Sequence, residues 1–205
     1  MESKTPMRLS FGTQEVQSQR KLSLDLMVSV QGVFSREFSL LSRSAQVMAL
    51  LGLQHNHPFH RDSVFLLLLA LGPMVWLSMI WLFAFQPLPW HAIWSPVFLS
   101  VALWQPVFEE LLFRGIVQGH LLQSIARQKT WFGLSISNLL TSIAFSLAHL
   151  ANHSIWWSLL VFVPSLYFGF VRDRFGSVYP SITLHVFYNT GYFLLIGEVT
   201  LLSSR

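Results

Sequence analysis

The sequence contains no cysteine and few charged residues. Its 205 residues include 13 Lys and Arg and 9 Asp and Glu, and 53% of them are hydrophobic. The absence of thiols excludes disulfide bonds and a cysteine nucleophile. Charged residues make up 11% of the chain, whereas they make up about a quarter of an ordinary soluble domain. The composition therefore indicates an integral membrane protein.

Several motifs are also missing. No Gly-x-Ser-x-Gly sequence supplies a serine nucleophile, and no His-Glu-x-x-His sequence supplies a zinc site. Residues 1–21 lack the apolar core of a cleavable signal peptide. The net charge of +4 comes from basic residues at the ends of apolar stretches rather than from a patch, so we expect no nucleic-acid partner.

Long apolar stretches dominate the chain after residue 62. They predict an all-α fold, a polytopic transmembrane helical bundle of about five to six spans. We expect Pro96 and Pro106 to bend or break the second stretch, which is too long for one straight span. The five stretches are Ser63–Phe85, Ala92–Ile125, Trp131–Leu150, Ile155–Val171 and Val178–Leu202.

The chain divides by composition into two parts. Residues 1–62 hold seven Lys and Arg residues and form an N-terminal cytoplasmic or interfacial part, with amphipathic segments at Leu22–Phe34 and Phe38–Leu53. Residues 63–205 form the transmembrane domain. Under five spans, the remaining basic residues between stretches fall on the same side as the N-terminus, so the positive-inside rule places the N-terminus in the cytoplasm.

The most unusual feature is charge inside an apolar run. Glu109, Glu110 and Arg114 lie in the stretch from Ile93 to Val117, where each charge costs roughly 2.5–3.5 kcal/mol at a bilayer centre. Glu110 and Arg114 are four residues apart, so they share a helical face and can pair. Glu109 has no such neighbour and is left available for chemistry.

Two further helices carry polar residues. His149 ends a stripe formed with Phe145, Ser142, Thr141 and Asn138, and this face should contact protein or water rather than lipid. His185 and Asn189 are four apart on the last stretch, with Ser181 and Tyr192 near the same face. Each of these residues alone can also be explained by packing or by helix–helix hydrogen bonding.

Together these residue types favour hydrolysis of an amide by water. A carboxylate shielded from water has a raised pKa, in the range useful for a general base, and with a histidine it can deprotonate a water molecule. A second histidine and an asparagine amide can donate hydrogen bonds to the oxyanion of the transition state.

The same residues resemble a known family. The sequence is similar to the CAAX protease and bacteriocin-processing family of intramembrane proteases, also called the Abi family, over roughly residues 93–195. Three motifs carry the resemblance in order: Glu109-Glu110-x-x-x-Arg114, Phe145-x-x-x-His149 and His185-x-x-x-Asn189.

The resemblance implies an active site in a cavity between helices. Glu109 and His149 would activate water, His185 and Asn189 would stabilise the oxyanion, and Glu110 with Arg114 would support them. It also favours a mechanism without a metal, with zinc at Glu109, His149 and His185 as the alternative.

Two other functions remain open from the sequence. One is a non-proteolytic immunity or scaffold protein that keeps the fold, and the other is a proton-coupled transporter, although no repeated halves are visible.

Expected partners of a protease are membrane lipids and a protein or peptide substrate: a prenylated CAAX tail, a bacteriocin or pheromone leader, or the membrane anchor of a sorted protein. The short chain favours a bacterial processing or sorting role at the inner membrane. Oligomeric state is not readable.

Overall fold

The computed structural model describes residue 21 and residues 42–54, 58–83, 85, 87–123, 130–131 and 133–196. The chain divides into two compact units, Met1–Gln46 and Val47–Arg205. The amphipathic segment predicted at residues 22–34 lies outside the described residues. Within the predicted segment at residues 38–53, the helix α2 is formed by Arg43–Leu51.

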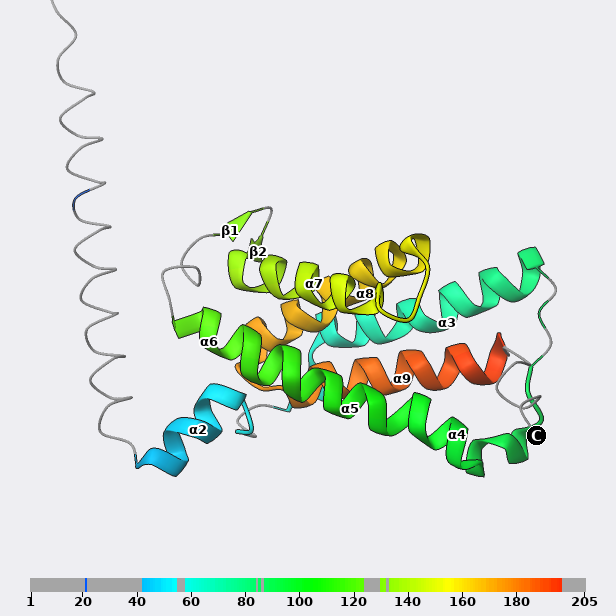
Figure 1. Ribbon diagram of the computed structural model, residues 1–205, viewed down its shortest axis with the longest axis horizontal. Coiled ribbons are helices and arrows are strands. Elements are labelled where there is room, and N and C mark those ends of the chain that lie inside the picture. Colours follow the sequence, from blue (N-terminus) through cyan, green and yellow to red (C-terminus); the bar gives the residue numbers. More distant parts are fainter. Residues whose placement is uncertain are drawn as a thin grey trace, which may run out of the picture. The chain divides into compact units, whose positions relative to one another are not determined.

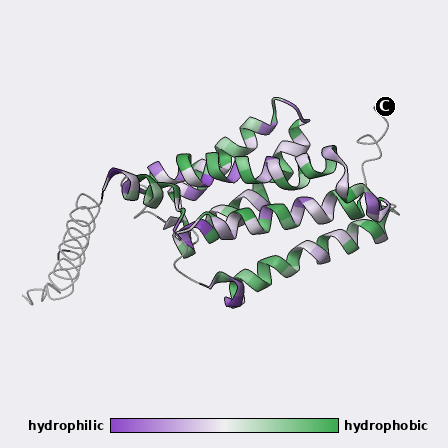
Figure 2. Cartoon of the chain, turned by 90° about the horizontal axis from the view of Figure 1, so that it is seen from below, coloured by the Kyte–Doolittle hydropathy of each residue, from purple (hydrophilic) through white to green (hydrophobic). Residues whose placement is uncertain are grey.

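The second unit is built mainly from helices, as Figure 1 shows. One of them, Pro96–Gln123, is continuous and carries the two glutamates; we call it the glutamate helix. The long helices carry mostly hydrophobic residues (Figure 2). The other helices are α3 (Ser63–Phe83), α7 (Ile136–His149), α8 (Ile155–Phe175) and α9 (Tyr179–Leu195), with short 3-10 turns η1 (Phe59–Arg61) and η2 (Trp90–Trp94).

Among the residues that the structure describes, three helices are by length and composition able to cross a membrane: α3, the glutamate helix and α8. The apolar helix α7 is shorter, with 14 residues, and α9 has 17. Several exposed tryptophans lie at a helix end or in the turn before a helix, a position suited to the membrane interface; they are Trp81, Trp90, Trp94 and Trp156. The predicted class, a helical membrane bundle, is confirmed.

The glutamate helix does not break at Pro106. Ser95 accepts a hydrogen bond from the Phe98 N–H, and Pro96 occupies the first turn, where no N–H is needed. Two π-helical segments then interrupt the α-helical pattern on either side of the glutamates. In order, the helix consists of α4 (Pro96–Leu99), η3 (Ser100–Trp104), α5 (Gln105–Glu110), η4 (Leu111–Val117) and α6 (Gln118–Gln123).

The stretch predicted as a helix from Trp131 is helical only from Ile136. Residues 130–135 instead contain a short antiparallel hairpin, β1 (Thr130–Trp131) with β2 (Leu134–Ser135). Gly133 has a φ of 79°, a value that glycine adopts without steric cost. Ser135 then caps α7 by accepting from the Asn138 N–H.

Polar residues of α7 are buried against α8, as their spacing predicts. Asn138, Thr141 and Ser142 are fully buried. The Asn138 amide donates to the Leu166 carbonyl and its oxygen accepts from the Ser142 hydroxyl. Gly169 of α8 leaves room for this amide, because a Cβ there would collide with it. The bond from Asn138 to Leu166 crosses between the two helices and holds them in register.

Two features hold the end of the bundle at which α3 begins. An apolar cluster joins α3, α8 and α9. Asp62 caps α3 by accepting from the Val64 and Phe65 N–H groups, and it also pairs with Arg174 at 2.8 Å. This hydrogen bond from Arg174, with those from the backbone, lowers the pKa of Asp62 from its ordinary value of 3.8. The cluster consists of Phe65, Leu68, Phe168, Val171 and Leu184.

Candidate active site

Three helices supply the polar side chains predicted to do chemistry. The glutamates lie on α5, His149 lies at the end of α7, and His185 and Asn189 lie one turn apart on α9. The helices α5 and α9 run side by side (Figure 1). The π-helical segments before and after α5 set the direction in which the glutamates point, because each adds a residue to a helical turn.

Glu110 forms the buried centre of the site. Its Oε1 atom lies 3.1 Å from Nη1 of Arg114 and 2.8 Å from Nδ1 of His185. Glu110 and Arg114 are fully buried, and His185 is 6% exposed. The ion pair predicted from the four-residue spacing is therefore present, and a histidine from another helix joins it.

The Arg114 guanidinium has further partners that the sequence did not indicate. It donates to both the carbonyl and the hydroxyl oxygen of Ser165 on α8. The rings of Phe145 and Phe168 lie 4.6 and 5.4 Å from its central carbon, within range of cation–π attraction. Because these contacts satisfy a charge removed from water, Arg114 can stay ionised and keep Glu110 in place.

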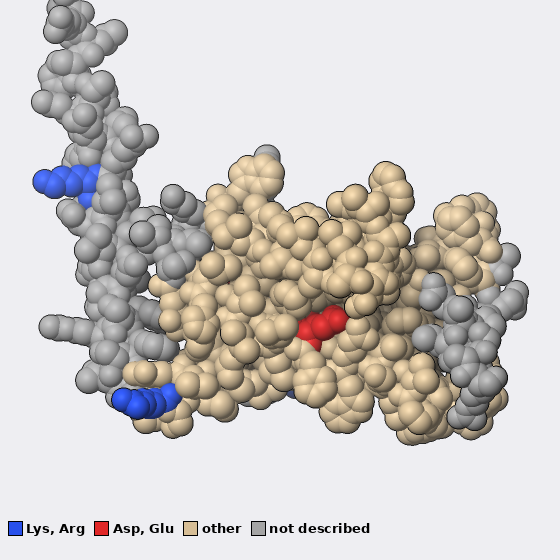
Figure 3. Space-filling model, viewed as in Figure 1, with Lys and Arg blue, Asp and Glu red and all other residues tan. Residues whose placement is uncertain are grey.

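Glu109 is the more accessible carboxylate. Its side chain is 20% exposed, and its Oε2 lies 3.7 Å from Nε2 of His185. Gln105, one turn earlier, donates to Oε1 at 3.0 Å. Acidic atoms reach the surface near the middle of the face seen in Figure 3. A carboxylate in such a position can reach both a substrate and a water molecule.

The two nitrogens of His185 therefore face different carboxylates. A carboxylate accepts hydrogen bonds, so Nδ1 must carry a hydrogen to bond Glu110. This leaves Nε2 directed at Glu109, across a gap too long for a direct hydrogen bond. The ring also stacks on Phe168, with centroids 4.6 Å apart and planes at 18°. His185 is thus fixed by two contacts while one nitrogen remains available.

His149 joins this group through an aromatic ring. The Phe145 ring lies 4.5 Å from the His149 ring and 5.9 Å from the His185 ring, between centroids. His149 Nδ1 lies 2.9 Å from the Phe145 carbonyl, which can only accept, so Nε2 of the neutral ring is free of hydrogen. The structure therefore places His185 beside Glu109 and connects His149 to His185 through the Phe145 ring.

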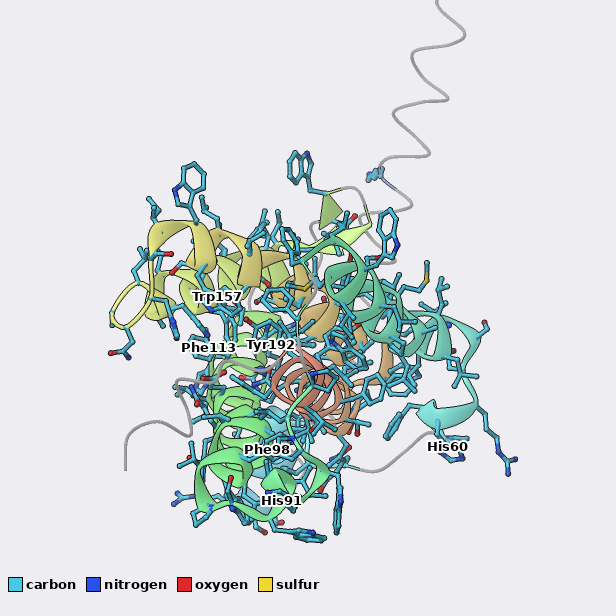
Figure 4. The ribbon with its side chains drawn as sticks, turned by 90° about the vertical axis from the view of Figure 1, so that its right-hand side faces the viewer. His60, His91, Phe98, Phe113, Trp157 and Tyr192 are labelled. Carbon is cyan, nitrogen blue, oxygen red and sulfur yellow. The ribbon has the colours of Figure 1, made fainter. Side chains whose placement is uncertain are left out.

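The ring contacts continue beyond His149. His153 stacks on it, and Trp157 and Tyr192 follow, with the last two ring centroids 5.4 Å apart. Figure 4 labels Trp157 and Tyr192, together with Phe113, in the same region of the bundle. Aromatic side chains therefore line the neighbourhood of His149 from α7, α8 and α9.

Asn189 is held by the glutamate helix itself. Its Nδ2 donates to the Val101 carbonyl of η3 at 3.0 Å. The amide nitrogen carries two hydrogens, so a second N–H remains after this bond.

Among the residues that the structure describes, no group of three or more His, Cys, Asp or Glu could hold a metal ion. The zinc alternative at Glu109, His149 and His185 stays a prediction.

Comparison with protein families gives a match. The family described as type II CAAX prenyl endopeptidase Rce1-like matches residues 89–191, about half of the chain. The matched region contains the glutamate helix, α7, α8 and most of α9, and so every candidate catalytic or supporting residue predicted from the sequence. Neither the curated proteins nor the solved structures give a match.

Proposed function

Because the chain belongs to the type II CAAX prenyl endopeptidase Rce1-like family, we propose that it is an intramembrane endopeptidase that hydrolyses a peptide bond of a membrane-associated protein or peptide. The observation that carries the proposal is the convergence of Glu109, Glu110 and His185 from two helices. Two carboxylates and an imidazole are costly to bury within an apolar bundle, so their presence together is evidence of a functional role.

The proposed reaction begins with water. Glu109 accepts a proton from a water molecule that also hydrogen-bonds Nε2 of His149, and the water oxygen attacks the scissile carbonyl carbon. The proton then passes to the leaving amine nitrogen as the C–N bond breaks. General-base catalysis of this kind contributes typically 10²–10⁴-fold. The 20% exposure of Glu109 supports this role, since the buried Glu110 has less access to water.

His185 and Asn189 are the proposed oxyanion stabilisers. With hydrogens on both ring nitrogens, His185 can donate from Nε2 to the oxygen that becomes negative, while its Nδ1 donates to Glu110. Asn189, one turn later on α9, contributes its second N–H. In this scheme Arg114 acts through Glu110, by fixing the carboxylate that orients His185.

The proposed location is a bacterial inner membrane with a cytoplasmic N-terminus. The family description points to prenylated CAAX tails, and leader peptides or membrane anchors of sorted proteins are the other substrate classes we consider. In each case the substrate is held at the membrane, and the exposed apolar side chains of the long helices anchor the enzyme in the same membrane.

The test compares cleavage of membrane-bound peptides by the wild type and by Glu109→Gln in the same vesicles. We expect a loss of about 10²–10⁴-fold in kcat, with unchanged thermal stability. Phe108→Ala is the matched control, because this neighbour is 65% exposed and directed away from the buried core. Equal cleavage by Glu109→Gln would remove the proposal and favour a scaffold protein.

A further inference from the structure

The Val101 carbonyl lies at a gap in the backbone hydrogen bonding of the glutamate helix. In the π-helical segment η3, hydrogen bonds run back five residues, and the Gln105 N–H bonds the Ser100 carbonyl. The next residue in this pattern is Pro106, whose partner would be Val101. Proline has no N–H, so the pattern leaves the Val101 carbonyl without a backbone donor.

Asn189 supplies the missing donor from another helix. Its Nδ2 lies 3.0 Å from the Val101 oxygen. Pro106 is fully buried, so water cannot readily replace an amide there. Because Pro106 has no N–H, it leaves the Val101 carbonyl available to accept from the Asn189 side chain. An alanine at 106 would provide an N–H that competes with Asn189 for the same oxygen.

We propose that Pro106 is a positioning residue for catalysis, because it keeps the Val101 carbonyl open so that this carbonyl orients the Asn189 amide. The inference rests on the proposed role of Asn189 as an oxyanion donor. An asparagine side chain rotates freely about its last bond unless a partner fixes it. With one N–H held by Val101, the second N–H has a fixed direction on the face of α9 that also carries His185.

The first experiment is a double-mutant cycle in the full-length protein. Pro106→Ala should lower kcat by about 10–100-fold with little change in KM, as expected for misplacement of a catalytic group. Asn189→Ala should lower kcat by about 10²–10³-fold. The double variant should be no worse than Asn189→Ala, because Pro106 acts only through the amide.

A second pair of variants isolates the N–H. Alanine at 106 is compared with its α-hydroxy acid analogue, lactic acid, which has the same side chain and an ester oxygen in place of the N–H. The ester variant should keep kcat near that of the wild type, whereas alanine should not. Pro96→Ala is the control, because Pro96 occupies the first turn of α4 and is exposed.

Each contrary result has a distinct meaning. Additive losses in the cycle, or equal losses from alanine and its ester analogue, would overturn the inference and leave the proposed function intact. Restored activity in the double variant would also overturn it, because Asn189 would then serve only to satisfy Val101. Wild-type activity of both Asn189→Ala and Glu109→Gln would contradict the proposed function itself.

Discussion

Oε1 of Glu110 accepts hydrogen bonds from two side chains at once, Arg114 at 3.1 Å and His185 at 2.8 Å. The same oxygen therefore couples a salt bridge within one helix to a histidine of another. Both Glu110 and Arg114 are fully buried, so each charge depends on the other for stabilisation. This arrangement gives the pair two separable functions, in folding and in orienting His185.

The folding function predicts unequal effects of single and double substitutions. Arg114→Met should destabilise the protein by about 3–5 kcal/mol, because it leaves the Glu110 carboxylate buried without its cation. Adding Glu110→Gln removes that charge, so the double variant should be more stable than Arg114→Met alone. Equilibrium unfolding in mixed micelles measures both. A double variant less stable than Arg114→Met would show that the pair is not coupled.

Sequence spacing predicted the Glu110–Arg114 pair and the buried face of α7, because both depend only on the period of a single helix. It did not predict that His185 contacts Glu109 and Glu110, because that contact depends on how α9 is displaced along the glutamate helix. Helix ends counted from composition gave no information on this displacement. The two prolines indicated a distortion, but not that π-helical segments would absorb it.

The sequence did not indicate that Arg172 is buried. We expected this residue at the end of an apolar stretch, and it does lie in the last turn of α8. Helix α8 continues past it to Phe175, and the side chain is 3% exposed. Its Nε donates to the Arg114 carbonyl in η4, and its Nη2 donates to the Leu50 carbonyl at the end of α2. Sequence spacing does not reveal an arginine that bonds main-chain oxygens of other helices, so only the place of Arg172 near a helix end could be predicted.

Arg172→Gln should therefore impair both folding and activity. Each buried carbonyl left without a donor costs about 1–3 kcal/mol, and the Arg114 carbonyl lies one turn from Glu110. We expect a lower unfolding free energy and a reduced kcat. Arg174→Gln is the control, because Arg174 is exposed, and it should have a small effect at neutral pH. Equal effects of the two substitutions would contradict the structural role of Arg172.

Close packing between α7 and α8 predicts the effect of a single methyl group. In Gly169→Ala the new Cβ would collide with the Asn138 amide, which bonds Leu166 and Ser142. The helices must separate or the amide must rotate, at a cost of about 1–3 kcal/mol. Gly115→Ala is the matched control, because its Cβ would meet Leu51 at 3.5 Å, an ordinary contact. Unfolding midpoints should fall only for Gly169→Ala, and an unchanged midpoint would show that α8 can shift without cost.

The Asp62–Arg174 pair predicts that the stability of the folded protein depends on pH. Asp62 lies just before α3, outside the membrane-spanning helices. The hydrogen bond from Arg174 makes the pKa of Asp62 lower in the folded protein than its ordinary value of 3.8. Ionised Asp62 therefore stabilises the folded state above pH 3.8, and this contribution is lost as the pH falls further, through the folded pKa.

Asp62→Asn tests this contribution cleanly, because asparagine caps a helix as well as aspartate does but carries no charge. Thermal unfolding of the wild type and the variant should be compared in detergent between about pH 6 and about pH 3. We expect the wild type to be the more stable at the upper end, with the difference shrinking as Asp62 becomes protonated. Arg174→Gln removes the main cause of the lowered pKa and should weaken the pH dependence in the same range. A constant difference across the range would mean that the pair contributes nothing through ionisation.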